Sequence, residues 1–170
     1  VSSFMIKKIG INYVIIGHSE CRASGETDKT LQEKLRLALK NNITVIFCIG
    51  ENKKEKREKK TLKVLKSQIS RVLKKRYNFK KIIIAYEPVW SIGSGKLPLA
   101  SELKKNSILL KKFVKKKFRL NYEPKFLYGG SVDKSSIHGF KSIRELDGFL
   151  IGGASKSSKN FIDIIKNFYK

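Results

Sequence analysis

Short apolar runs alternate along this chain with longer segments in which apolar residues recur every three or four positions. Runs rich in β-branched side chains that end at glycine or at an acid are typical of buried parallel strands. We expect strands at Tyr13 to Ile16, Thr44 to Ile49, Ile82 to Tyr86, Lys125 to Tyr128 and Gly148 to Ile151.

The segments between these runs show the repeat of amphipathic helices. The apolar positions are, segment by segment, Leu31, Leu35 and Leu39; Leu65, Ile69 and Leu73; Leu103, Leu110 and Val114; Phe161, Ile164, Ile165 and Phe168. Such a βα alternation predicts an α/β fold with one parallel sheet, right-handed crossovers and outer helices. There is no linker or low-complexity tract, so we predict a single domain over residues 1–170.

The chain is strongly basic, with 38 Lys and Arg against 14 Asp and Glu and a formal charge of +24. Such an excess raises the hypothesis of nucleic-acid binding. The lysines are spread over several predicted helices, as on solvated outer faces, and no basic motif interleaved with aromatics is present. We therefore expect no specific nucleic-acid function, only weak nonspecific adsorption at low salt.

The remaining bulk features favour a cytoplasmic protein. No apolar run approaches transmembrane length, so no membrane association is expected, and no signal-peptide pattern opens the chain. Cys21 and Cys48 lie far apart without CxxC spacing, which suits a reducing compartment without disulfides. Neither cysteine has metal-ligand neighbours in the sequence.

The segment after the third apolar run carries the first candidate chemistry. Glu87 comes directly after that run, so its carboxylate is expected at the C-terminal end of a strand. The arm Pro88, Val89 and Trp90 is stiff, whereas the stretch with Gly93 and then Ser94, Gly95 and Lys96 can absorb changes in φ and ψ. This pattern predicts a mobile lid; the alternative is a plain βα loop with an incidental acid.

A histidine follows another predicted strand. His18 stands at the end of the first apolar run, so it and Glu87 are expected at the same edge of the sheet, where barrel active sites lie. The residues after His18 are expected to begin a helical turn, whose positive end would keep the imidazole neutral. The other histidine, His138, lies in what we interpret as a short polar helix, and we assign it a structural role.

Five stretches of the sequence, in order, resemble the triosephosphate isomerase family. Tyr86 to Lys96 resembles its catalytic-glutamate strand and flexible loop, and Ile15 to Glu20 its catalytic-histidine strand end. The other matches are Val45 to Glu51, Tyr128 to Val132 and Asp147 to Ser155, which resemble the intervening strand and the last two phosphate-side loops. The resemblance implies part of a (β/α)8 barrel, a TIM barrel.

The resemblance also implies an activity: interconversion of dihydroxyacetone phosphate and glyceraldehyde 3-phosphate, with no metal or organic cofactor. It makes Glu87 the base and His18 the electrophile, with Glu20 as a supporting partner of His18; a surface carboxylate is the competing interpretation of Glu20. The positions that would bind the substrate phosphate are Gly93, Ser131, Gly152 and Gly153. A helix N-terminus after Gly153 would add a favourable dipole.

Some positions depart from the family's pattern. Cys21 stands where the family usually has arginine, which puts a local salt bridge in doubt. Ser91 and Ser94 replace the usual alanine and threonine of the loop, both small changes. No residue here matches the family's catalytic lysine and the asparagine near it, or the loop through which two subunits interlock.

A complete barrel needs eight βα units in about 250 residues, and the resemblance makes the five units here the fourth to the eighth. Residues 1–10 are expected to be the tail of a preceding helix with Phe4, Met5 and Ile9 on its apolar side. We therefore expect a C-terminal portion, inactive alone, of a protein that is a homodimer at full length. The competing hypotheses are another phosphate-handling barrel isomerase, which the pairing of His18 with the Glu87 lid disfavours, and a non-catalytic basic interaction module derived from a barrel.

Overall fold

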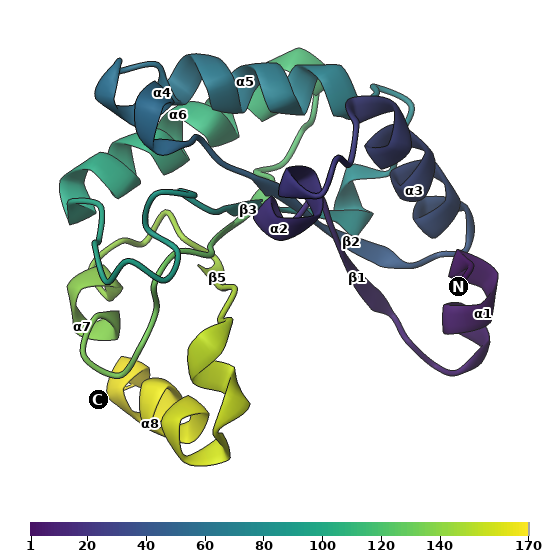
Figure 1. Ribbon diagram of the computed structural model, residues 1–170. Helices are drawn as coiled ribbons and strands as arrows, with labels where there is room; N and C mark the ends of the chain where they lie inside the picture. Colours follow the sequence, from purple (N-terminus) through teal and green to yellow (C-terminus); the bar gives the residue numbers. More distant parts are fainter. Residues whose placement is uncertain (170) are drawn as a thin grey trace.

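The computed structural model describes residues 1–169, and its centre is a five-stranded parallel sheet in the order β1-β2-β3-β4-β5 (Figure 1). The strands are β1 (Tyr13–Ile16), β2 (Thr44–Ile49), β3 (Ile82–Tyr86), β4 (Lys125–Tyr128) and β5 (Gly148–Phe149). The predicted bounds of the first four are confirmed. The fifth is shorter than predicted, because it pairs only with the end of β4 and no strand of residues 1–169 lies on its other side.

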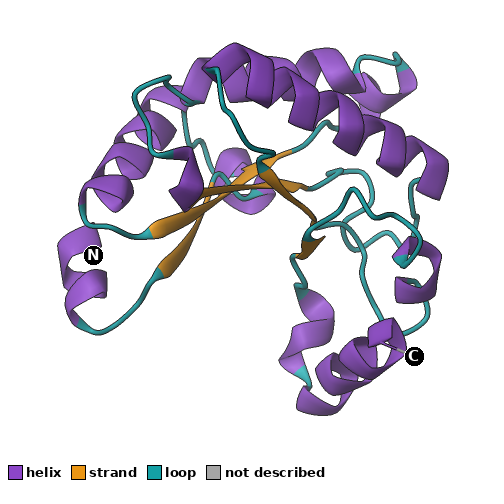
Figure 2. Ribbon diagram, turned by 180° about the vertical axis from the view of Figure 1, so that it is seen from behind, coloured by secondary structure: helices purple, strands orange, loops and turns teal. Residues whose placement is uncertain are grey.

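Helices α3, α5 and α6 arch over one face of this sheet, α1 and α8 lie at the two ends of the arch, and α2 lies below it (Figures 1 and 2). The α-helices are α1 (Ser3–Lys8), α2 (Ser19–Ala23), α3 (Asp28–Lys40), α4 (Lys53–Arg57), α5 (Thr61–Val72), α6 (Ala100–Phe118), α7 (Ile137–Phe140) and α8 (Ser158–Tyr169). The short 3-10 helices η1 (Phe79–Lys81) and η2 (Gly153–Lys156) precede β3 and α8.

The hydrophobic core lies between the sheet and helices α3, α5 and α6. Alternate side chains of the strands, such as Phe47 and Ile84, are completely or almost completely buried there. Leu35 and Leu65, from the predicted apolar stripes of α3 and α5, are fully buried in the same cluster. Burial of each such side chain stabilises the fold by about 1.5–3 kcal/mol.

The other face of the sheet carries the side chains that lead to the candidate site. Cys48 of β2 is in register with Ala85 of β3, and both are fully buried. Because successive side chains of a strand alternate between faces, Glu87 follows Ala85 on this same face. At the edge strand the same face is open, and Ile15 of β1 is 51% exposed.

The apolar sides predicted for the two terminal helices are present but largely exposed. In α8, Phe161 and Ile165 are exposed and only Ile164 is buried. In α1, the predicted apolar side is also exposed, at Phe4, Met5 and Ile9. The physical reason is the same in both helices, since each lies at an end of the sheet where no further element of residues 1–169 covers it.

The helix around His138 differs from its prediction as well. α7 is short, as expected, but amphipathic, because Ile137 and Phe140 are buried in the core. His138 itself is exposed on the outer side of this turn.

Candidate active site

His18 and Glu87 meet at the C-terminal edge of the sheet. His18 follows β1 and is the N-cap of α2, and Glu87 follows β3 directly. Nε2 of His18 lies 3.3 Å from Oε1 of Glu87. The Glu87 side chain is almost completely buried, whereas that of His18 is 33% exposed. The pair therefore consists of a buried carboxylate and a partly exposed imidazole.

Three neighbours define the surroundings of the Glu87 carboxylate. The Ser19 backbone N–H donates to Oε2 at 3.4 Å, and Cys48 of β2 is a neighbour that lowers the pKa of the same carboxyl. Gly129 allows close approach, since a Cβ there would lie 2.9 Å from Cγ of Glu87. Burial raises the pKa of Glu87, and His18, Cys48 and Ser19 partly offset that increase. A carboxylate of raised pKa is a stronger base than an exposed one.

The contacts of His18 favour one neutral tautomer. The Glu20 backbone N–H donates to Nδ1 at 3.4 Å, so Nδ1 is an acceptor and the ring proton belongs on Nε2, facing Glu87. The predicted helical turn after His18 is confirmed as α2, with His18 as its N-cap. The Glu20 carboxylate lies 3.8 Å from Nδ1 and its side chain is 88% exposed. The structure thus places the backbone of Glu20, not its carboxylate, in hydrogen-bonding contact with the ring.

The sequence did not single out Arg22 and Cys48 as parts of this site. The Arg22 side chain donates to the carbonyl of Gly17 at 2.8 Å and to that of Cys48 at 2.9 Å, so it ties the ends of β1 and β2 together. Burial lowers the pKa of Arg22, and Asp28 opposes that shift. Burial raises the pKa of Cys48, and the negative charge of Glu87 raises it further. The alternation of strand faces could have indicated Cys48, but nothing local indicates what Arg22 contacts.

The segment predicted as a lid has an anchored base and an exposed tip. Trp90 Nε1 donates to Glu51 Oε1 at 2.9 Å, and the hydroxyl of Tyr86 donates to the same oxygen at 3.1 Å. Burial raises the pKa of Glu51. The tip, residues 92–97, is exposed, and Gly93 and Gly95 have φ of +65° and +68°, values that favour glycine. The tip is exposed and its hydrogen bonds are local, since the Ser94 hydroxyl donates to the carbonyls of Trp90 and Ser91.

The four predicted phosphate-binding positions are only partly brought together. The Ser131 hydroxyl donates to the carbonyl of Ser91 at 2.6 Å, which links the loop after β4 to the base of the lid. Gly152 precedes η2, so the helix N-terminus expected after Gly153 is present as a short 3-10 turn. At Gly93, Gly152 and Gly153 a Cβ would meet no heavy atom within 4 Å, so the backbone there faces open space.

Comparison with known proteins places this arrangement in a family. The family model described as "Triosephosphate isomerase" matches residues 1–168. The chain belongs to the triosephosphate isomerase family.

Relatives from bacteria and fungi match with similar identity. The triosephosphate isomerase of Buchnera aphidicola subsp. Cinara cedri is 42% identical over 98% of this chain and 67% of its own length. That of Coprinopsis cinerea is 40% identical over 97% and 67%, and that of Saccharomyces cerevisiae 39% identical over 95% and 66%. The chain therefore spans about two thirds of the length of these triosephosphate isomerases.

Cys21, which departs from the triosephosphate isomerase pattern, lies on the surface next to Arg22. Cys21 is exposed and its thiol is free. The neighbouring Arg22 makes the contacts to the strand ends, and its NH1 lies 3.8 Å from Asp28. An arginine in this turn therefore still connects the strand ends.

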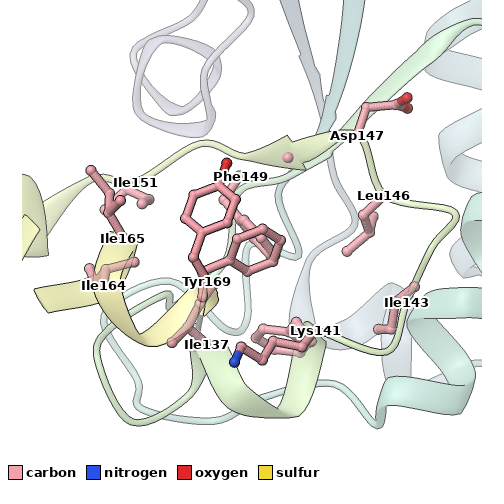
Figure 3. Close-up of a pocket in the computed structure, with 13 residues that line it drawn as sticks. Ile137, Lys141, Ile143, Leu146, Asp147, Phe149, Ile151, Ile164, Ile165 and Tyr169 are labelled. Atoms are coloured by element: carbon pink, nitrogen blue, oxygen red, sulfur yellow. The ribbon is translucent and has the colours of Figure 1, made fainter. Parts of the chain in front are cut away.

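An apolar groove lies away from the catalytic pair of this triosephosphate isomerase fold (Figure 3). It has a volume of about 280 Å³ and lies between β5, α7 and α8, with Phe149, Ile137 and Ile164 among its lining residues. None of the candidate catalytic or phosphate-binding residues lines it.

Among residues 1–169 there is no cluster of three or more His, Cys, Asp or Glu side chains suited to a metal ion. No helix in the same range has the length and apolarity to span a membrane.

Proposed function

We propose that this chain supplies the catalytic base and electrophile of a triosephosphate isomerase, which interconverts dihydroxyacetone phosphate and D-glyceraldehyde 3-phosphate in glycolysis and gluconeogenesis. The observation that carries the proposal is the 3.3 Å approach of His18 Nε2 to Glu87 Oε1 at the ends of β1 and β3. Membership of the family supports it.

Glu87 acts as the base. Its carboxylate removes a proton from the hydroxyl-bearing carbon next to the substrate carbonyl, which leaves an enediolate. The same proton then returns to the former carbonyl carbon, and transfer of the hydroxyl proton from one oxygen to the other completes the isomeric triose phosphate. A glutamate base beside a neutral histidine is the known arrangement in this enzyme family. The buried position of Glu87 supports this role, because burial raises its pKa and therefore its basicity.

His18 acts as the electrophile. With the proton on Nε2, a neutral ring donates to the substrate carbonyl oxygen and stabilises the negative charge that develops there. Support for this tautomer comes from the Glu20 backbone N–H, which occupies Nδ1. The carboxylate of Glu20 is the proposed supporting group for the ring, although it lies in solvent.

Backbone N–H groups hold the phosphate. We assign them to Gly93, Ser131, Gly152 and Gly153, three of which face open space around their Cα atoms. The lid, built from Pro88, Val89 and Trp90 and from Ser94, Gly95 and Lys96, closes over the bound substrate. Closure excludes water and protects the enediolate from losing its phosphate.

The complete activity belongs to a whole barrel, of which this chain supplies five strands. We propose that these are the fourth to eighth strands, that the enzyme is a cytoplasmic homodimer and that it needs no cofactor. The catalytic lysine and the interlocking loop of the family have no counterpart among the residues described here. A non-catalytic basic module is the competing function, and no observation in the structure favours it over the isomerase.

The proposal is tested in a chimera that places the first third of the Buchnera relative before this chain. Glu87→Asp withdraws the carboxylate by about an ångström, and we expect turnover to fall on the order of a hundredfold with little change in substrate affinity. Glu87→Ala should abolish turnover, whereas Lys112→Ala, a change at an exposed position in the middle of α6, should not alter it. Full turnover in Glu87→Ala would show that Glu87 is not the base.

A further inference from the structure

Exposed positive charge gathers at the end of the molecule opposite the catalytic pair. Parallel strands begin at one edge of the sheet, so the segments leading into β3 and β4 lie at that edge. We call the following residues of these segments the basic end: Lys75, Arg76, Lys80, Lys81, Lys116, Lys117, Arg119 and Lys125. All are exposed except Lys81, which is half-buried.

Packing brings the two segments of the basic end side by side. The rings of Phe79 and Phe118 stand 4.5 Å apart, which joins η1 to the end of α6. Lys80 follows the first of these phenylalanines, and Lys117 and Arg119 flank the second. Lys125 pairs in register with Ile83 at the start of β3. The sequence alone suggested lysines spread over separate outer faces, whereas here the fold concentrates them.

These charges lack acidic partners within residues 1–169. No ion pair involves any residue of the basic end among the described contacts. Two acids close to Lys125, Glu123 in the sequence and Asp147 through its bond to the Phe126 backbone N–H, pair with other lysines: Glu123 with Lys115 at 3.1 Å and Asp147 with Lys111 at 2.7 Å. A group of cations without counter-charges repels itself and attracts a polyanion.

Helix capping explains only part of this arrangement. Lysines in the last turn of a helix interact favourably with its dipole, which accounts for Lys116 and Lys117 at the end of α6. Lys75 and Arg76 lie in a loop, and Lys125 is the first residue of a strand. No helix dipole accounts for positive charge at these positions.

We propose that the basic end binds double-stranded nucleic acid through its phosphate backbone, without reading the sequence. Lysine and arginine side chains contact phosphates of any duplex by releasing condensed counterions. A single strand is disfavoured as the ligand, because no aromatic ring of residues 73–81 and 114–126 is exposed for stacking on bases. Phe79, Phe118 and Phe126 are buried, and Tyr77 and Tyr122 are half-buried. A bilayer is also disfavoured, because residues 73–81 and 114–126 include no exposed large apolar side chain to insert.

Fluorescence anisotropy with a labelled DNA duplex tests the proposal, using the folded chimera described above and two triple variants of it that have equal charge. One variant carries Lys80→Gln, Lys117→Gln and Lys125→Gln at the basic end. The matched control carries Lys53→Gln, Lys54→Gln and Lys63→Gln, three exposed and unpaired lysines of α4 and α5. Each lost phosphate contact should lower the slope of log affinity against log salt by about one. For the basic-end variant we expect the magnitude of this slope to fall by about three. We also expect its affinity for the duplex at ~100 mM salt to fall at least about tenfold. The control variant should lose much less of both.

Several results would overturn this inference. One is equal loss in both variants, which is what an unfolded polycation would give. Others are the absence of duplex binding at about 50 mM salt, tighter binding of a single strand of the same length, or tighter binding of vesicles of phosphatidylcholine with phosphatidylserine. None of these measurements depends on isomerase activity, so the inference and the proposed function stand or fall separately.

Discussion

Glu87 holds a carboxylate where water scarcely reaches it, since its side chain is only 3% exposed. Its pKa is raised by burial, above the ordinary value of about 4.3 for glutamate. A raised pKa in the folded state means that protonation favours folding. The contribution of Glu87 to stability is therefore present at low pH and is lost as pH rises through its folded-state pKa.

This reasoning predicts a pH-dependent effect of Glu87→Gln on stability. In the chimera, the variant should gain free energy of unfolding relative to the parent as pH rises above about 4.3, by about 1.4 kcal/mol for each unit by which the pKa is raised. The gap should level off above the folded-state pKa. Urea unfolding at a series of pH values measures it, and a gap that stays constant with pH would contradict the account.

Arg22 should contribute stability through its two carbonyl contacts. Arg22→Met leaves the carbonyls of Gly17 and Cys48 without their charged donor, and we expect a loss of about 3 kcal/mol in the chimera. Arg22→Lys should recover only part of it, because one ammonium cannot reproduce the planar fork. Urea unfolding checks this, with Lys53→Met as an exposed control. A loss no larger than the control's would mean that the strand ends are held by other contacts.

Single residues of the site were predictable where they directly follow a strand. His18 and Glu87 were found in this way, because parallel strands bring their C-terminal ends to one edge. Arg22 was missed because its partners are backbone carbonyls, which have no sequence signature. Cys48 was read only as a free cysteine, since its contact with Glu87 depends on the register between β2 and β3.

At the scale of elements, the segment after β3 combines a fixed base with an exposed tip. Trp90 is held by Glu51, whose buried carboxylate also accepts from Tyr86. The tip glycines adopt positive φ in open space. Such a construction suits a hinge whose base stays in place while the tip moves.

The lid hypothesis predicts a specific failure in Gly93→Pro. Proline removes the N–H and fixes φ near −65°, so turnover should fall strongly, phosphate-bearing transition-state mimics should bind more weakly and more methylglyoxal should escape. Global stability should change little. Gly93→Ala is the matched control, because it keeps the N–H at the same positive φ and should be milder. Unchanged by-product partitioning and unchanged mimic affinity in Gly93→Pro would rule the lid out.

Four of the five strands were predicted with the bounds that they have in the structure. β2 and β3 lie inside the sheet and have the continuous apolar signature of buried strands, and the edge strand β1 also matches. β5 was predicted too long, and the apolar side of α8 is exposed at Phe161 and Ile165. The sequence shows that these faces are apolar, but it cannot show whether another strand or helix packs against them.

At the scale of the whole molecule, the sheet has two open edges. Tyr13 and Ile15 of β1 are 60% and 51% exposed, and the apolar residues of α8 lie open at the other end. Unpaired edges and uncovered apolar surface favour aggregation or partial unfolding. We therefore predict that the chain expressed alone is poorly folded and essentially without isomerase activity. A cooperative thermal transition accompanied by activity near that of its relatives would contradict this prediction.

The most direct test of the account is the isomerase activity of the chimera measured beside that of the chain alone. The account predicts that the chimera folds cooperatively and interconverts the two triose phosphates at a rate within about tenfold of the Buchnera enzyme, a difference of about 1.4 kcal/mol in barrier. It predicts that this rate disappears in Glu87→Ala and that the chain alone shows none. A chimera that folds cooperatively yet has no activity, or one whose activity survives Glu87→Ala, would contradict the central claim.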